Sequence, residues 1–267
     1  DSALGASLLF SLPLESWSVT SDFELEGYAI DRENSLLILG QNGSTPTQIA
    51  ATPLLVSDFL SQTITALRDL SHECAAPYSH ATLRPEEYLK AERLREADLC
   101  AVLIGVGSEL QKQGDQSFWN ALIVSEYGDL AFAFEEAFIK GGLRADLKNG
   151  MSAALTHWYK DKSRVSACDR AALTRLDDAL LQAEDVIDVF GHKRLCTENV
   201  MKLTCLPEAP SYLGIAAYDI ANAPEFALLP DTINTEHLLQ ILEEASATRV
   251  GAIAFRDASL AAKIFPA

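Results

Sequence analysis

Two consecutive segments with helical periodicity dominate the sequence between residues 57 and 112. The first begins at Ser57, a residue with capping chemistry, and its pattern ends at Pro77. Apolar residues recur in it at three- and four-residue steps: Leu60, Ile64, Leu67, Leu70 and Cys74. The second, from Pro85 to Lys112, opens polar and then becomes apolar on nearly every face, which predicts a buried, central helix. A pair of long helices is therefore the expected centre of the fold.

The first fifty residues look β-like instead. Residues 27–30 and 36–39 flank the polar residues 31–34, and this arrangement predicts a short β-hairpin. Further helical patterns cover residues 116–139, 153–159, 169–189 and 235–246, and residues 250–255 look β-rich. The predicted fold class is α+β, predominantly helical, with the helix pair and a small N-terminal β-hairpin element.

Length and composition are those of a globular protein. The chain has 267 residues, of which 48% are hydrophobic and 22% charged, and this is enough to bury a substantial core. The prolines at positions 207 and 210 mark an expected boundary. It divides the chain into a domain of residues 1–206 and a C-terminal extension of residues 207–267.

The net charge of −17 argues against nucleic acid as a partner, because nucleic-acid-binding proteins concentrate Lys and Arg. Anionic membrane surfaces are disfavoured for the same reason. No stretch approaches about 18 uninterrupted apolar residues, and the apolar residues 3–14 follow no basic region, so neither a membrane span nor a signal peptide is expected. The five cysteines form no C-x-x-C pair and are interpreted as reduced thiols, which favours a cytoplasmic protein.

The end of the first helical segment carries His72 and Glu73, and Glu96 follows about twenty residues later in the second. Zinc peptidases of the gluzincin type place two histidines at i and i+4 of one helix and a glutamate beside the first. A third ligand, a carboxylate, comes from a following helix. In this chain the i+4 position is Ala76. On a helix, residues 72, 73 and 76 would project away from the apolar stripe, toward solvent or a cleft.

The helical position of Glu96 gives a physical argument for a role. It shares a stripe with Leu89, Cys100 and Leu103, so its carboxylate is expected among apolar neighbours. A carboxylate in such a place needs a metal, a cation or hydrogen bonds to offset the loss of hydration. The competing interpretation is that His72 and Glu73 occur together by chance on an exposed helix face.

The order of these motifs resembles a family of bacterial putative metallopeptidases, zincin-like proteins in which a helix ending in His-Glu-x-x-His precedes a helix carrying Glu-Ala-Asp. The similarity covers about residues 26–213 and continues in three short motifs, at residues 125–131, 154–159 and 195–198. The resemblance implies a zincin-like helix pair in which His72 and Glu96 bind zinc. It also implies Glu73 as the general base that activates a zinc-bound water to hydrolyse peptide bonds.

With Ala76 in place of the second histidine, the implied zinc site is one ligand short. By spacing, Cys100 or His80 are possible substitute ligands, although a buried thiol and a solvent-exposed loop histidine are the simpler interpretations. The expected function is that of a degenerate zinc metallopeptidase acting on a peptide or protein, with little or no zinc bound. The alternative is a non-catalytic helical binding or scaffolding protein that retains the peptidase fold.

Overall fold

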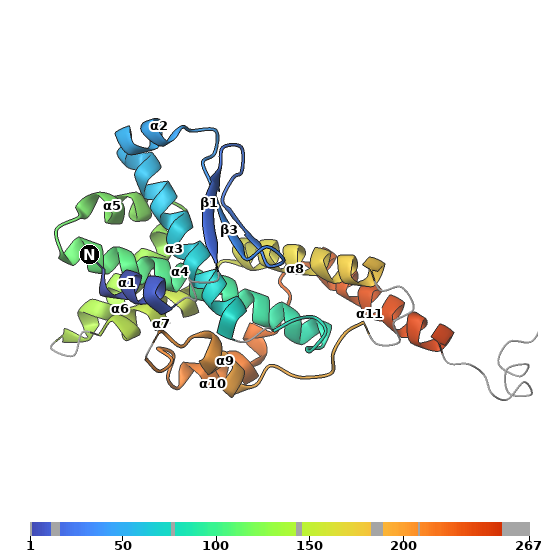
Figure 1. Cartoon of the computed structure of the whole chain (residues 1–267). Helices are drawn as coiled ribbons and strands as arrows, with labels where there is room; N and C mark the ends of the chain where they lie inside the picture. The colour runs from blue at the N-terminus through green and yellow to red at the C-terminus, as the bar shows by residue number, and fades with distance from the viewer. Residues whose placement is uncertain are drawn as a thin grey trace, which may run out of the picture.

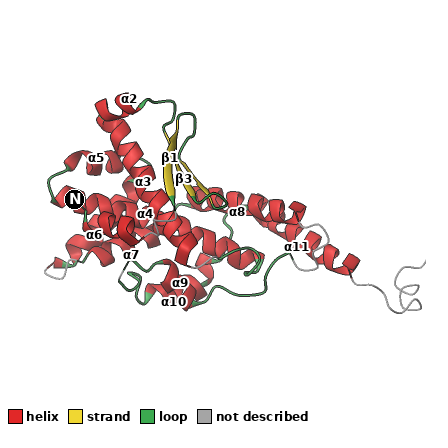
Figure 2. Cartoon of the chain, in the orientation of Figure 1, coloured by secondary structure: helices red, strands yellow, loops and turns green. Residues whose placement is uncertain are grey.

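The computed structural model describes residues 2–11, 17–75, 78–142, 146–182, 189–207 and 209–252. It confirms a predominantly helical α+β fold with a small sheet near the N-terminus (Figures 1 and 2). The helices are α1 (Ala3–Ser11), α2 (Pro46–Ala51), α3 (Pro53–Ala75), α4 (Pro85–Lys112), α5 (Gln116–Val124), α6 (Gly128–Lys140), α7 (Leu147–Trp158), α8 (Lys162–Gln182), α9 (Thr197–Leu203), α10 (Ala216–Asn222) and α11 (Thr232–Ala252), with a 3-10 turn, η2, at Pro224–Phe226. No helix in these ranges is long and apolar enough to cross a membrane.

The sheet contains the predicted hairpin and one strand that was not predicted. β2 (Tyr28–Asp31) and β3 (Leu36–Gly40) pair antiparallel around the polar turn, as expected. β1 (Ser18–Asp22) adds in parallel to the other edge of β3, which gives the order β1-β3-β2. All five residues of β1 are exposed. Because neither face of this strand is buried, its sequence lacks the alternation of apolar and polar residues that predicts a strand.

Helix α3 lies between the sheet and the helical body of the protein (Figure 1). Toward the sheet, Leu67 and Leu70 join Leu37 in a small apolar cluster. Toward the body, Ile64 belongs to the main core. Because α3 is packed on both sides, residues outside its predicted apolar stripe are buried as well, and this decides the environment of the charged residues described below.

Helix α4 has the predicted bounds and is the central, buried helix that the sequence indicated. It packs against α3, α5, α7, α8 and α9. Gly107 allows the close approach of α5, because a Cβ atom at this position would lie 2.5 Å from Leu122 Cδ1. Every charged side chain that α4 directs at a neighbouring helix must therefore find a partner there.

Several predicted helices have different bounds. The one predicted at 116–139 is broken into α5 and α6, where Gly128 approaches the Ile123 carbonyl so closely that a Cβ atom would lie 2.3 Å from its oxygen. Helices α7 and α8 begin earlier than predicted, because Asp146 and Asp161 cap them by accepting hydrogen bonds from backbone N–H groups two residues later.

The chain beyond residue 207 contributes to the same apolar core as α4. Ala217 and Ile220 of α10 and Leu238 and Ile241 of α11 are buried in it, and α11 packs along α8. The division at residue 207 stays a prediction. The β-rich segment predicted at residues 250–255 is wrong at residues 250–252, because α11 continues to Ala252. Residues 253–255 of that segment lie outside the described part of the chain.

Candidate functional site

A cavity of about 660 Å³ opens between α3, α4 and α8. It is lined by three of the residues that the sequence singled out on the helix pair, His72, Glu73 and Glu96, and by His80 from the connection that follows α3. The other charged or phenolic residues of the lining are Arg32, Asp69, Tyr78, Tyr88, Glu92, Arg95, Arg175 and Asp178. The helix pair thus brings the predicted site residues to one pocket, together with several charged residues to which no role had been assigned.

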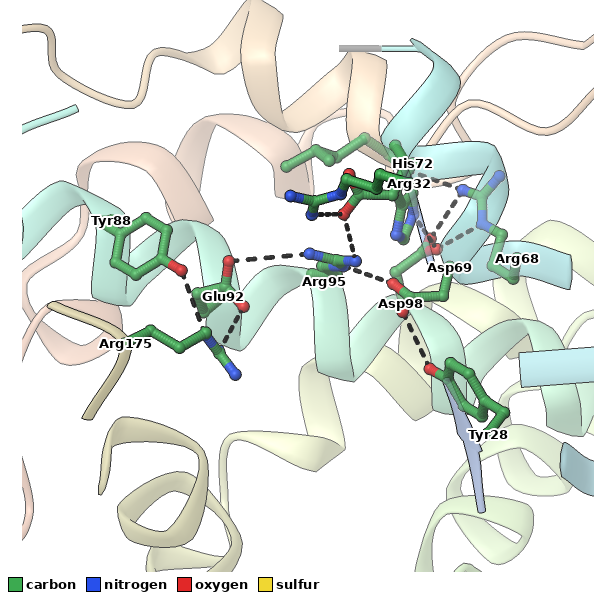
Figure 3. Close-up of polar contacts among 12 residues, drawn as sticks. Tyr28, Arg32, Arg68, Asp69, His72, Tyr88, Glu92, Arg95, Asp98 and Arg175 are labelled. Carbon is green, nitrogen blue, oxygen red and sulfur yellow. Dashed lines mark hydrogen bonds and ion pairs between the residues drawn. The ribbon is translucent and has the colours of Figure 1, made fainter. Parts of the chain in front are cut away.

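Four of the residues that line this pocket form the Arg95 cluster, which we define as Arg95 with the carboxylates of Asp69, Glu73 and Glu92 (Figure 3). Arg95 Nε lies 2.5 Å from Asp69 Oδ1, Nη2 lies 2.7 Å from Glu73 Oε1, and Nη1 lies 3.9 Å from Glu92 Oε1. Burial would lower the pKa of Arg95, but the neighbouring carboxylates raise it above its usual value. One guanidinium therefore interacts with three carboxylates from two helices.

Residues outside the Arg95 cluster form further ion pairs and hydrogen bonds with its carboxylates. Arg32, an exposed residue after β2, places Nη2 2.7 Å from Glu73 Oε1. The Tyr28 hydroxyl donates to Asp69 across 3.0 Å. Arg175 of α8 pairs with Glu92 at 2.6 Å and also donates to a tyrosine hydroxyl. Glu73, the predicted general base, consequently has two guanidinium groups on a single oxygen.

A second group of charges, the Asp98 cluster, lies deeper between α3, α4 and the segment after α9. It consists of Asp98, Arg68, His72 and Tyr212, all buried. Asp98 accepts from Arg68 Nε at 2.6 Å and from the Tyr212 hydroxyl at 2.6 Å, and its Oδ2 lies 2.9 Å from His72 Nε2. Burial alone would raise the pKa of Asp98, but Arg68 and His72 lower it to about 2. The carboxylate is therefore ionised in the fold.

His72 is only 4% exposed, although the sequence predicted that it projects away from the apolar stripe. Its Nε2 also lies 3.1 Å from the Leu203 carbonyl oxygen, so both neighbours of Nε2 accept hydrogen bonds and Nε2 carries a proton. Burial, and then Arg68, lower the pKa of the imidazole. The ring is thus neutral, and Nδ1 keeps a lone pair that is buried and has no partner among the described residues.

The position of Glu96 differs from its prediction. Its side chain is exposed in the pocket rather than enclosed by apolar residues. Partial burial and the nearby carboxylates of Asp69 and Glu92 raise its pKa. The enclosed carboxylate of α4 is Asp98, which lies between the buried residues Leu94 and Val102 at four-residue steps. The stripe argument made for Glu96 therefore applied more strongly to Asp98, and the same spacing could have identified it.

The possible substitute ligands lie in different places. His80 lines the pocket and makes an edge contact with Tyr88, with ring centroids 6.3 Å apart, and burial lowers the pKa of its imidazole. Cys100 packs against the main core and is not among the residues that line the pocket, and burial raises the pKa of its thiol. Ala76 and the side chain of Cys74 lie outside the described part of the chain.

The chemistry of these donors does not fit a zinc site with three protein ligands. One lone pair, on His72 Nδ1, suits a metal, because the other ring nitrogen is oriented by a carboxylate as in many metal sites. The carboxylates of Asp69 and Glu73, however, are held by Arg95. Within the described ranges, no three side chains of His, Cys, Asp or Glu come together in a way that could hold a metal ion.

Comparison with known proteins identifies the family. The profile of the putative metallopeptidase family DUF6782 matches residues 63–213, more than half of the chain. The chain belongs to this family. The matched region runs from the middle of α3 through Tyr212 and includes His72, Glu73, Glu96 and the whole Asp98 cluster. No curated protein and no solved structure matches the chain.

Proposed function

We propose that this chain is a degenerate metallopeptidase: it retains a pocket that binds a peptide or a peptide segment of a protein, and it has lost zinc-dependent hydrolysis. One observation carries the proposal. Arg95 forms ion pairs with Asp69 and Glu73, so a guanidinium stands among the carboxylates of the pocket where a zinc peptidase would need a metal and a free base.

The charge of Arg95 opposes both parts of a zinc mechanism. Two unit charges about 4 Å apart interact by about 4 kcal/mol at an effective dielectric constant of about 20, and a divalent cation doubles this repulsion. A general base must also have a free lone pair on the reacting water's side. Glu73 Oε1 already accepts from Arg95 and forms an ion pair with Arg32, and the two positive charges reduce the basicity that Glu73 can offer through its other oxygen. The sequence adds Ala76, whose methyl group cannot coordinate a metal.

The pocket is suited to a peptide in size and in polarity. Its volume of about 660 Å³ falls in the range of sites that enclose small ligands. Side chains of both charge signs line it, and they can meet the polar backbone and the charged groups of a peptide. The competing function is zinc-dependent hydrolysis, and the observation in its favour is the free lone pair on His72 Nδ1.

The experiment compares metal content, hydrolysis and binding on the same preparation. The protein is purified without chelators and its zinc is measured by mass spectrometry. A mixture of fluorogenic peptides is then assayed for cleavage with and without added zinc, and for binding by fluorescence anisotropy. We expect zinc well below one equivalent, saturable peptide binding, and no cleavage beyond that of a Glu73→Gln variant.

Two results would overturn the proposal. Stoichiometric zinc together with cleavage that Glu73→Gln abolishes would establish an active zinc peptidase. If that zinc were lost in Cys100→Ala or His80→Ala, the substitute ligand would be identified at the same time. An absence of saturable binding by any peptide of the mixture would refute the peptide-binding pocket itself.

A further inference from the structure

We propose that the pocket recognises a primary ammonium group of its peptide, with Glu96 as the anionic hydrogen-bond acceptor and His72 Nδ1 as a second, neutral acceptor. This inference rests on the proposed function, because it specifies which part of a bound peptide the pocket holds. The group belongs either to the peptide's N-terminus or to a lysine side chain.

Glu96 is the carboxylate of the helix pair that the pocket leaves available. Asp69, Glu73 and Glu92 are all held by guanidinium groups at 2.7 Å or less. Glu96 lines the same cavity, is exposed in it, and makes no hydrogen bond or ion pair with any residue of the described ranges. Its charge is therefore free to pair with a ligand.

The charge of the pocket as a whole favours a cation. Five carboxylates line it against three guanidinium groups, which leaves an excess of two negative charges when both histidines are neutral. The unpaired charges are on Glu96 and Asp178, both of which reach solvent. A net charge of −17 on the whole chain adds a field that attracts cationic ligands.

His72 points to the same ligand class independently of the acidic residues. Its ring lines the cavity, and the side of the ring that carries Nε2 is bound to Asp98 and the Leu203 carbonyl. The remaining nitrogen, Nδ1, is buried without a partner among the described residues. Since a neutral imidazole with a proton on Nε2 can only accept at Nδ1, the missing partner is a hydrogen-bond donor.

An ammonium group fits these two acceptors better than other cations. It carries three donors that point in different directions, so it can reach a carboxylate and an imidazole at once, whereas the planar fork of a guanidinium matches the carboxylate alone. A monovalent cation also needs only the free carboxylate of Glu96. Zinc would need the carboxylates that Arg95 holds.

The test uses the full chain, isothermal titration calorimetry and three tetrapeptide amides. The first is Ala-Ala-Ala-Ala-amide with a free N-terminus, the second is its N-acetylated form, and the third is N-acetyl-Ala-Lys-Ala-Ala-amide. We expect at least one of the two peptides with an ammonium group to bind about tenfold tighter than the acetylated alanine peptide, as for one charge-assisted hydrogen bond. The better of the two identifies the source of the group.

Glu96→Gln supplies the decisive variant, because it keeps the shape and removes the charge. It should remove the about tenfold preference for the ammonium peptide and leave the affinity for the acetylated peptide unchanged. Glu86→Gln is the matched control, since Glu86 is an exposed residue of the same helix and is not among the residues that line the pocket. It should leave all affinities unchanged.

The outcomes separate this inference from the proposed function. Equal binding of free and acetylated peptides, or a preference that survives Glu96→Gln, would overturn the inference and leave peptide binding intact. Uptake of zinc that depends on Glu96 would also overturn it. If none of the three peptides binds while the fluorogenic mixture does, the ammonium group is not the determinant, and if neither binds, the proposed function fails as well.

Discussion

Helices α3 and α4 carry two clusters of charged residues that differ in how completely their groups are paired. In the Asp98 cluster, Arg68 is 2% exposed and Asp98 is not exposed at all, and the carboxylate is shared among a guanidinium, an imidazole and a hydroxyl. In the Arg95 cluster, the guanidinium is 22% exposed, and the neighbouring Glu96 is left without a partner in the described chain.

The difference follows from access to water. An ion enclosed by protein must be compensated by its neighbours, because removing it from water costs several kcal/mol. At a pocket wall, water can solvate an unpaired carboxylate until a ligand replaces it. We therefore expect the first cluster to stabilise the helix pair, and we propose that the pocket at the second binds a ligand. His72 connects the two clusters, because its Nε2 belongs to the Asp98 cluster and its side chain lines the pocket that the Arg95 cluster also lines.

The largest effect on stability should come from disrupting the Asp98 cluster. Asp98→Ala leaves Arg68, His72 and the Tyr212 hydroxyl without their shared acceptor. We expect a loss of about 3–5 kcal/mol in the free energy of unfolding, measured by urea denaturation. Glu136→Ala, which removes an exposed ion pair with Lys140, should scarcely change it. A similar small loss in both variants would show that the Asp98 cluster does not stabilise the fold.

The second prediction concerns a double variant that should make the Arg95 cluster more like a zinc site. Arg95→Met removes the guanidinium that Asp69 and Glu73 share, and Ala76→His supplies an imidazole at the i+4 position from His72. The double variant should gain about 2.7 kcal/mol of stability at a zinc concentration of about 100 times its Kd, measured as a zinc-dependent thermal shift.

Three controls make this prediction specific. The unaltered chain and each single variant should show a smaller zinc-dependent shift, and Glu96→Ala in the double variant should reduce it. Pro77 follows the new histidine and disfavours helical backbone at residue 76, which limits the affinity that can be gained. A shift of the same size in the unaltered chain would mean that Arg95 does not exclude zinc.

Much of this architecture could be predicted from the sequence, because the apolar pattern of a long helix depends only on residues that are near one another in the sequence. The bounds of α4 and the hairpin of β2 and β3 were predicted on that basis. Neither β1 nor the helix break before Gly128 was predicted. The first depends on pairing with a strand 18 residues further along, and the second depends on contact between a glycine and one carbonyl oxygen.

The site was predicted less completely, for a related reason. Spacing identified His72, Glu73 and Glu96, which all line the pocket. It could not show that Arg95 and Arg32 hold Glu73, because Arg32 comes from the sheet and meets the helix pair only in the folded chain. Whether any of these residues binds metal stays a prediction.

The third prediction concerns the effect of pH on the stability that the Asp98 cluster contributes. His72 has a lowered pKa in the fold because burial and Arg68 disfavour its cation, so below pH 6.5 the unfolded chain binds a proton that the folded chain does not. The free energy of unfolding should therefore fall by up to about 1.4 kcal/mol per pH unit as pH drops below 6.5.

Asp98 extends this loss to lower pH. Its pKa is about 2 in the fold against 3.8 ordinarily, so the stability it contributes is present above 3.8 and is lost as pH falls toward 2. Urea denaturation between about pH 7 and about pH 5 separates the contribution of His72 and His80, whose pKa burial lowers, from that of Asp98. His72→Gln should reduce the slope of this part of the profile, whereas His157→Gln, at a partly exposed position, should not. Parallel profiles for the two variants would contradict the assignment to His72.

The smallest effect is expected at Glu96, beside the Arg95 cluster, and it has the opposite sign. The pKa of Glu96 is raised in the fold by partial burial and by Asp69 and Glu92, so its ionisation costs stability above pH 4.5. Glu96→Gln should therefore raise the free energy of unfolding at neutral pH, by no more than about 0.5 kcal/mol because solvent screens an exposed side chain. The gain should vanish below pH 4.5, where the carboxyl is protonated in both states.

Glu86→Gln again serves as the control for Glu96→Gln. Glu86 lies in the first turn of α4, where a negative charge interacts favourably with the helix dipole, so its replacement should slightly destabilise the protein. A residue retained for packing alone would not be expected to make the protein more stable when it is replaced. If Glu96→Gln stabilises the chain and also abolishes its preference for an ammonium peptide, Glu96 is maintained at a cost to stability for binding, as is common at functional sites. A loss of stability in Glu96→Gln at neutral pH would instead place Glu96 with the structural charges of the Asp98 cluster.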